Sequence, residues 1–293
     1  MANTFTPDQM GAVALAVAAK GTGLLARTYR DAEAEFRQGV GATVPVRVRG
    51  FKANSAGVGN KTTPLAVSDV NEVAHDVKIT ENLYVRALAS QEDLLSLMSV
   101  SKAVIAPAVA AITDAANAEI AALYNGLAAH ATIKWSANAA ASAIIDARAA
   151  LLTAVGDLAG TTVYVEASPA VYADLLKSGA LDKNQPQNFG SGVQVYESPR
   201  ITSDAFVIHT DRAVAAALRA PIVSSNSANA VSVKSDDGTF AVTIVEAYTN
   251  DYAADDILTH VLFGASLMGE PKFDGTDGSV EFVPSAIRVA KGA

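Results

Sequence analysis

The stretch Ser90–Leu127, SQEDLLSLMSVSKAVIAPAVAAITDAANAEIAALYNGL, is the part of the sequence around which the rest of the chain is organised. Its apolar residues recur at spacings of three and four, which predicts one helix with a continuous apolar stripe. From Pro107 to Leu127 such a helix would be roughly 30 Å long, enough to span a domain. The stripe reads Ile105, Val109, Ile112, Ala116, Ile120, Leu123 and Leu127, and we predict that Ile105, Val109, Ile112, Ile120 and Leu123 form the core of this element.

The start and the middle of this stretch carry residues that mark where a helix begins or bends. Ser90 can cap a helix, and the acids Glu92 and Asp93 that follow it suit the positive end of the helix dipole. Pro107 lacks a backbone donor and clashes with the preceding turn, so we expect the helix to bend or to begin there. The pattern alone favours an ordinary core helix, and the alternative, the spine of an assembling subunit, needs support from the flanking sequence.

The composition favours a chain with much of its surface covered. The 293 residues suffice for one large domain or two intermediate ones, and 50% of them are hydrophobic. Only 18% are charged, against about 25% in an average soluble domain. Neighbouring subunits would explain so few charges, although an alanine-rich soluble enzyme would look similar. The net charge of -8 argues against wrapping nucleic acid through a basic face, but not against a shell around it.

Several classes of protein are disfavoured by what the sequence lacks. It contains no cysteine, so disulfides and thiolate metal sites are excluded. The start, MANTFTPDQM, has no basic region before an apolar run, and the most apolar window, Ala103–Ile112, is far shorter than the roughly 20 residues that cross a bilayer. We therefore expect a soluble, cytoplasmic protein with no membrane contact.

A long ribbon is predicted before the helix. Val44, Val46 and Val48 alternate with polar residues or proline, and Glu72–Thr80 alternates again, with the polar segment Gly50–Asp69 between the two strands. A projecting two-stranded hairpin is only marginally stable alone, so it must pack on a partner. Charged side chains on two solvated faces are the alternative interpretation. The candidate contact residues between subunits are Arg47, Arg49, Lys52, Lys61, Glu72 and Asp76.

The sequence after the long helix predicts a compact α/β unit and then a strand-rich return, which we expect to pack on the long helix. In the α/β unit we predict helices at Ala139–Val155, Ser168–Gly179 and Asp211–Pro221, with strands at Val163–Val165, Val193–Tyr196 and Phe206–His209. In the return we predict strands at Val231–Val233, Phe240–Tyr248 and Ile257–Leu267, and a final pair of strands at Val280–Val283 and Ile287–Val289.

No constellation of residues predicts catalysis, a cofactor or a metal. The four histidines, His75, His130, His209 and His260, are scattered and have no metal-binding spacing. Asp274–Gly278 resembles a fragment of a calcium loop but lacks the remaining acidic ligand, which favours a solvated turn. We therefore expect interfaces between subunits to carry the function.

The order of the parts resembles a known family. The resemblance rests on an N-terminal segment, the long ribbon, the helix stretch, the α/β insertion and the strand-rich return. The phrases that carry it are Thr28-Tyr29-Arg30-Asp31, Glu35-Phe36, Gly41-Ala42-Thr43-Val44, Ser90-Gln91-Glu92-Asp93, Pro107-Ala108, Val163-Tyr164-Val165, Ser168-Pro169 and Val195-Tyr196-Glu197-Ser198. In these features the chain resembles the major capsid (coat) proteins of tailed bacteriophages, which share the Hong Kong 97-like fold.

This resemblance implies an α+β subunit and a shell-forming function. Hexamers and pentamers would close into an icosahedral phage head that encloses double-stranded DNA without reading its sequence. A scaffolding protein and a portal would be further partners, and the location would be the virion capsid, assembled in the host cytoplasm. The implied parts are an N-terminal arm at 1–40, an extended E-loop at 41–89, a P-domain with a spine helix at 90–136, an inserted A-domain at 137–222, and a return at 223–293 that completes the A- and P-domains.

Two alternatives stay open at the level of the sequence. An encapsulin-like compartment would share the fold but enclose protein cargo. An unrecognised soluble α/β enzyme would form a small oligomer and expose a pocket with convergent polar residues.

Overall fold

The computed structural model describes most of the chain. The described residues are 12, 14–16, 23–30, 43–51, 70–90, 104–156, 161–181, 187–190, 192–202, 204–221, 229–234, 240–250, 254–274 and 279–292. They divide into two compact units, each assembled from three separate stretches of the chain. The first unit combines Met1–Val44, Lys78–Ile120 and Ala216–Ala265, and the second combines Pro45–Val77, Ala121–Ala215 and Ser266–Ala293.

An antiparallel sheet is the framework of the first unit. Its order is β3 (Glu81–Ser90), β11 (Ala254–Leu267), β10 (Ala241–Thr249) and β9 (Asn229–Lys234), and β8 (Val214–Arg219) also pairs with β11. Tyr84 on β3 lies opposite His260 on β11, and Val245 on β10 lies opposite Leu258. Every second residue of β11 from Ile257 to Val261 is buried, as expected of a strand with one covered face.

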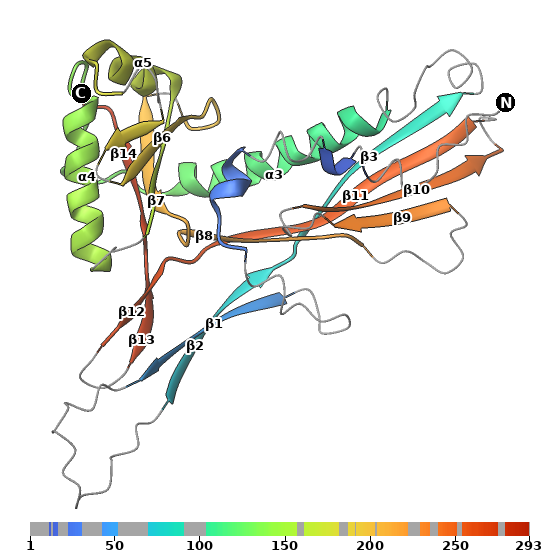
Figure 1. Ribbon diagram of the computed structural model, residues 1–293, viewed down its shortest axis with the longest axis horizontal. Helices are drawn as coiled ribbons and strands as arrows, with labels where there is room; N and C mark the ends of the chain where they lie inside the picture. Colours follow the sequence, from blue (N-terminus) through green and yellow to red (C-terminus); the bar gives the residue numbers. More distant parts are fainter. Residues whose placement is uncertain are drawn as a thin grey trace, which may run out of the picture. The chain divides into compact units, whose positions relative to one another are not determined.

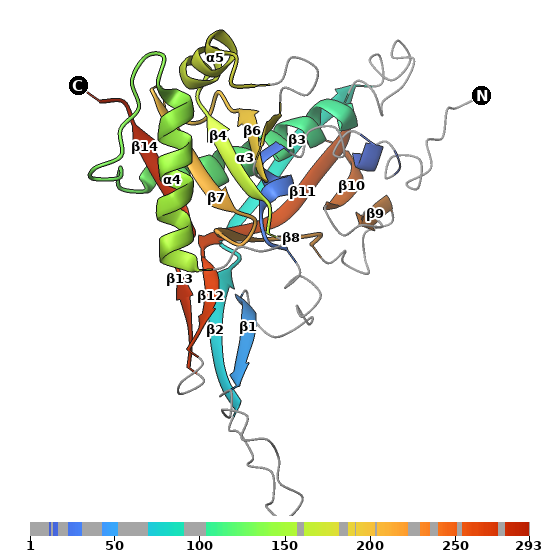
Figure 2. The same ribbon diagram turned by 60° about the vertical axis from the view of Figure 1, so that its left-hand side comes forward.

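Helix α3 (Ala106–Gly126) runs alongside β3 and β11 in the first unit (Figures 1 and 2). The predicted stripe faces inward, since Ile105, Val109, Ile112 and Ile120 are buried and Leu123 is half-buried. Leu83 and Val85 of β3 line a shallow cavity together with Ala111, Ile112 and Ala115 of α3. The predicted packing of the strand-rich return beside the long helix agrees with this arrangement.

A second sheet forms the core of the second unit. Its order is β14 (Ala286–Ala290), β7 (Ala205–Thr210), β4 (Val163–Ala167), β6 (Val193–Glu197) and β5 (Asn188–Gly190). Strands β4 and β6 are parallel, and the chain between them includes helix α5 (Pro169–Ser178). Helix α4 (Ala140–Val155) buries Ile144, Ala147 and Leu151 in the same hydrophobic cluster as the inward residues of β4, β6 and β7 (Figure 2).

Local signals explain both helices of this unit. Helix α5 begins at Pro169 after Ser168 and ends before Gly179, whose φ of 72° is the left-handed cap expected there. Helix α4 has no side-chain cap from its own N-cap residue, Ala139. Its first backbone groups are instead bonded to Asp174 of α5, since the two carboxylate oxygens accept from Asn138 N–H at 2.7 Å and Ala140 N–H at 3.3 Å.

Two ribbons complete the second unit. Strands β1 (Thr43–Phe51) and β2 (Val70–Lys78) pair as a two-stranded sheet, which confirms the predicted hairpin strands. Strands β12 (Glu270–Phe273) and β13 (Val280–Val283) form another, in which Pro271 lies opposite Phe282. The polar segment predicted between β1 and β2, at 52–69, lies outside the described residues, as does most of the N-terminal segment.

Two predictions of secondary structure were wrong in part or altogether. The helix does not begin at Ser90, which ends strand β3, and α3 begins at Ala106 with Pro107 as its second residue. The helix predicted at Asp211–Pro221 is wrong, because Val214–Arg219 is strand β8, buried from Val214 to Leu218. Strands β13 and β14 lie where the last two strands were predicted, and β13 pairs with β12 and β14 with β7.

Candidate assembly surfaces

The predicted contact residues of the β1–β2 ribbon pair with one another. Arg49 Nε donates to Glu72 Oε2 at 2.8 Å, and Arg47 Nη1 donates to Glu72 Oε1 at 3.2 Å. The hydrogen bond from Arg49 is the main reason that the pKa of Glu72 lies below its ordinary value. The charges are therefore partly matched within the ribbon, and the surplus that it presents to a neighbour is basic.

The other predicted contact residues divide into two groups. Asp76 is exposed on β2. Lys52 and Lys61 lie outside the described residues. The structure thus brings together Arg47, Arg49 and Glu72 of the predicted set.

His75 holds the ribbon to other parts of the second unit. Its Nε2 lies 2.9 Å from Ser266 Oγ, and its ring meets Phe282 of β13 edge-on, with 5.8 Å between centroids. Burial lowers the pKa of His75, although the nearby charge of Asp76 opposes that effect. Sequence patterns could not predict this contact, because neither Ser266 nor Phe282 is near His75 in the chain.

One face of the first unit's sheet exposes large apolar side chains. Tyr84 is 64% exposed and Leu88 is 46% exposed, and both lie on the same side of β3 as Arg86. Arg86 forms a bidentate pair with Asp256 of β11 at 2.6–2.9 Å, and these hydrogen bonds lower the pKa of Asp256. An apolar patch around a fixed ion pair is a surface suited to a protein partner.

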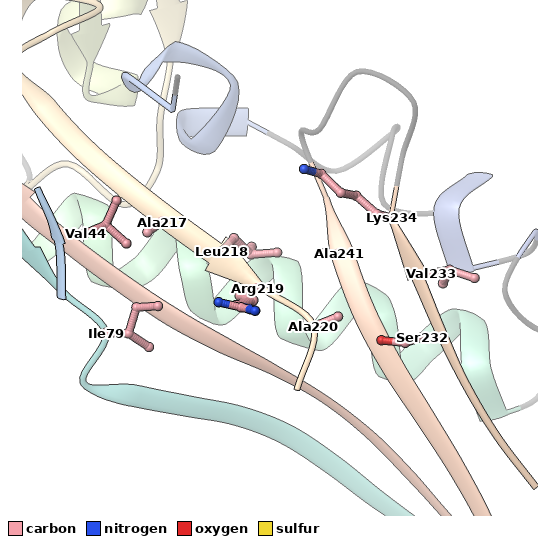
Figure 3. A pocket seen from close by; sticks show the side chains of 10 residues that line it. All are labelled: Val44, Ile79, Ala217, Leu218, Arg219, Ala220, Ser232, Val233, Lys234 and Ala241. Atoms are coloured by element: carbon pink, nitrogen blue, oxygen red, sulfur yellow. The ribbon is translucent and has the colours of Figure 1, made fainter. Parts of the chain in front are cut away.

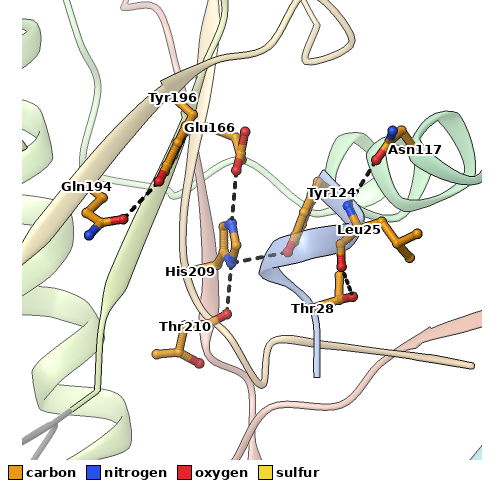
Figure 4. Close-up of polar contacts among 9 residues, drawn as sticks. All are labelled: Leu25, Thr28, Asn117, Tyr124, Glu166, Gln194, Tyr196, His209 and Thr210. Carbon is orange, nitrogen blue, oxygen red and sulfur yellow. Dashed lines mark hydrogen bonds and ion pairs between the residues drawn. The ribbon is translucent and has the colours of Figure 1, made fainter. Parts of the chain in front are cut away.

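Helix α3 also carries a polar residue that anchors another segment to it. Asn117 is buried, and its Oδ1 accepts a hydrogen bond from Leu25 N–H at 2.9 Å (Figure 4). Leu25 belongs to a short 3₁₀ helix, Gly23–Arg27, where Thr28 Oγ1 donates to Leu25 O. A buried amide on α3, next to the apolar stripe, therefore fixes Gly23–Arg27 against the helix.

A buried polar group lies in the second unit around His209. Its Nδ1 lies 2.8 Å from the Thr210 carbonyl oxygen and 3.2 Å from Tyr124 Oη, and its Nε2 lies 3.7 Å from Glu166 Oε1 (Figure 4). A carbonyl can only accept, so Nδ1 carries a proton. His209 and Glu166 are fully buried and Tyr124 nearly so, and such side chains reach no substrate. The group holds the end of α3, beyond Ile120, to strands β4 and β7.

The best-formed cavity of the first unit lacks groups for acid–base chemistry. Its volume is about 280 Å³, and Figure 3 shows the side chains that line it. Its polar side chains are Arg219 of β8 with Ser232 and Lys234 of β9, and none of the described residues that line it is a carboxylate or a histidine. Across the described residues there is no group of three or more possible metal ligands. In the same part of the chain, no helix has the length and apolar character to cross a membrane.

Comparisons with known proteins rest on the fold. No family model matches the sequence, and no curated protein is recognisably similar to it. A solved structure from Mycobacterium phage Che8 is similar with a TM-score of 0.58 and 14% identity over 90% of each chain. The capsid of Ralstonia phage GP4 is similar with a TM-score of 0.56 and 8% identity, and the match covers 91% of this chain and 88% of that one.

A third similar structure is a virus-like particle from Pyrococcus furiosus. It gives a TM-score of 0.54 and 12% identity, and the match covers 96% of this chain and 98% of that one. All three matches span nearly the whole of both chains, so the likeness concerns the complete arrangement of elements and not one motif. The chain therefore has the α+β, Hong Kong 97-like fold of phage capsid proteins.

Proposed function

We propose that the chain is the major capsid protein of a tailed bacteriophage. Copies of it assemble as hexamers and pentamers into an icosahedral head around double-stranded DNA, and the chain is not an enzyme. The observation that carries the proposal is the likeness over about nine-tenths of the chain to solved phage capsid structures. Scaffolding and portal proteins are the further partners, and assembly takes place in the host cytoplasm before the protein resides in the virion.

The surfaces of both units support an assembling subunit. Large apolar side chains are exposed on separate elements, at Tyr84 and Leu88 of β3, Ile145 of α4, Tyr248 of β10 and Phe273 of β12. Several modest contacts per subunit give a stable closed shell, because closure makes each further contact intramolecular. The low charged fraction, 18%, fits surfaces that neighbours cover.

We assign the parts of the chain accordingly. Residues 1–40 form the arm, 41–89 the E-loop, 90–136 the P-domain with its spine helix, 137–222 the A-domain, and 223–293 the return. The E-loop of one subunit lies over the P-domain of the next, where Arg47 and Arg49 present the ribbon's basic surplus.

Electron microscopy of the purified protein tests this function. We expect closed particles tens of nanometres across, and a small soluble oligomer would contradict the proposal. A deletion of Ala53–Thr63, which lies outside the described residues, should leave a folded subunit with the far-UV circular dichroism of wild type but no closed shells. Normal shells from that variant would remove the E-loop assignment and leave the capsid function standing.

An encapsulin-like compartment is the second candidate. The virus-like particle from Pyrococcus furiosus favours it, because its match covers the largest share of the chain among the three structures described. The content of particles isolated from the native source separates the two. Double-stranded DNA supports the capsid, whereas a single protein cargo without DNA supports the compartment.

A further inference from the structure

A groove in the second unit combines apolar walls with a cation. It lies between helix α4 and the β5–β6 edge of the sheet, and its volume is about 350 Å³. Ile145 at its rim is 59% exposed, although Ile144, one residue earlier, is fully buried. The lining residues are Ile144, Ile145 and Arg148 of α4, Ala180 after α5, Phe189 of β5 and Val193 of β6.

Arg148 is the unusual member of this lining. It is half-buried, and its Nε is shielded from solvent without a hydrogen-bond acceptor among the described residues. A carboxylate is the acceptor that the planar guanidinium of arginine fits best. The groove therefore combines apolar walls with a cation suited to an acidic partner.

The surroundings of the groove indicate that its binding partner is a protein and not a small molecule. Strand β5 is the last strand of its sheet, so its outer backbone edge is available for a further chain within the part that the structure describes. The exposed Ile145 extends the apolar surface beyond the groove itself. An arginine next to a large apolar side chain is the usual composition of a strong contact between proteins.

We propose that this groove is a docking site for a second copy of this chain, which inserts an apolar side chain and places a carboxylate against Arg148. The proposal rests on the assembly function proposed above. The chain carries 30 acidic residues against 22 basic ones, so a second copy offers carboxylates in excess. A ring of identical subunits needs contacts in which two different surfaces meet, and the groove supplies one of the two.

A single thiol gives the sharpest test, because the chain has no cysteine. Ile145→Cys places a unique reactive group at the rim of the groove. We expect a maleimide to label it readily in unassembled subunits and about tenfold or more slowly in assembled particles. Thr153→Cys, on an exposed position of the same helix, is the matched control and should react at the same rate in both states.

Charge reversal provides a second measurement. Arg148→Glu should lower the yield of particles about tenfold or more, while Arg148→Lys retains part of it. Lys177→Glu, a reversal at an exposed position of α5, should assemble as wild type does. Equal labelling of Ile145→Cys in particles and subunits would overturn the docking site and leave the capsid function intact. An absence of particles from the wild-type protein would instead overturn the capsid function, and the docking site with it.

Discussion

The contacts of the β1–β2 ribbon depend on the protonation state of a single residue, His75. Its ring lies between Ser266 of β11 and Phe282 of β13, and Asp76 is the charged group that acts on it. Because burial lowers the pKa of His75, the folded protein holds the ring neutral at a pH at which the unfolded chain has begun to bind a proton. The contact is therefore strongest at neutral pH and weakens in acid.

The sign of this effect gives a prediction. Below a pH of about 6.5 the unfolded state binds more protons at this position than the folded state, so stability falls as the pH falls. We expect the urea midpoint of the unassembled wild-type subunit to decrease more between pH 7 and pH 5.5 than that of His75→Gln. Ser266→Ala is the control, since it removes the hydrogen bond but keeps the titrating ring. An equal pH dependence in wild type and His75→Gln would contradict this role.

At the scale of elements, the sequence predicted those helix ends and strands that depend on residues close together in the chain. The cap at Gly179 and the β-branched runs of β9, β10 and β11 were read correctly, because each depends on neighbours in the chain. Strand β8 was read as a helix because VAAALR favours helix by propensity, whereas the strand is buried almost throughout and pairs with β11. A short apolar run buried on all sides has no periodicity that separates the two structures.

The start of α4 also depends on a residue that is distant in the chain, so the neighbouring sequence does not predict its cap. Nothing next to Ala139 caps this helix, and the cap comes from Asp174, which lies in α5. We predict that Asp174→Asn lowers the free energy of unfolding by about 1–2 kcal/mol, because an amide offers one acceptor oxygen where the carboxylate offered two.

Chemical denaturation followed by circular dichroism measures this change. Asp146→Asn, on an exposed position of α4, is the matched control and should change stability by less than about 0.5 kcal/mol. Equal effects of the two substitutions would show that Asp174 does not cap the helix.

At the scale of the whole molecule, the order of elements was more predictable than their pairing. Each unit is built from three separate stretches, so the partners of a strand are decided by topology and not by sequence distance. Strand β14, for example, pairs with β7 and not with β13 next to it in the chain. The same reason hid the contact of His75 with Ser266 and the setting of Arg148, whereas the alternation that predicted the strands of Arg47 and Glu72 is local.

The return of the chain to the second unit gives the last prediction. Val289 of β14 is fully buried in the same cluster as Trp135, the only tryptophan of the chain. Trp135 Nε1 donates to the Asp204 carbonyl oxygen at 2.9 Å, so the emission of this residue reports on the second unit alone. Val289→Asp would bury a charge in that cluster at a cost of about 3 kcal/mol or more. We expect red-shifted tryptophan emission and a lower melting temperature, while Lys272→Asp, on an exposed position of β12, should leave both unchanged. Because β14 lies at the end of the chain and β7 far before it, wild-type emission from Val289→Asp would mean that the second unit holds its core without the returning strand.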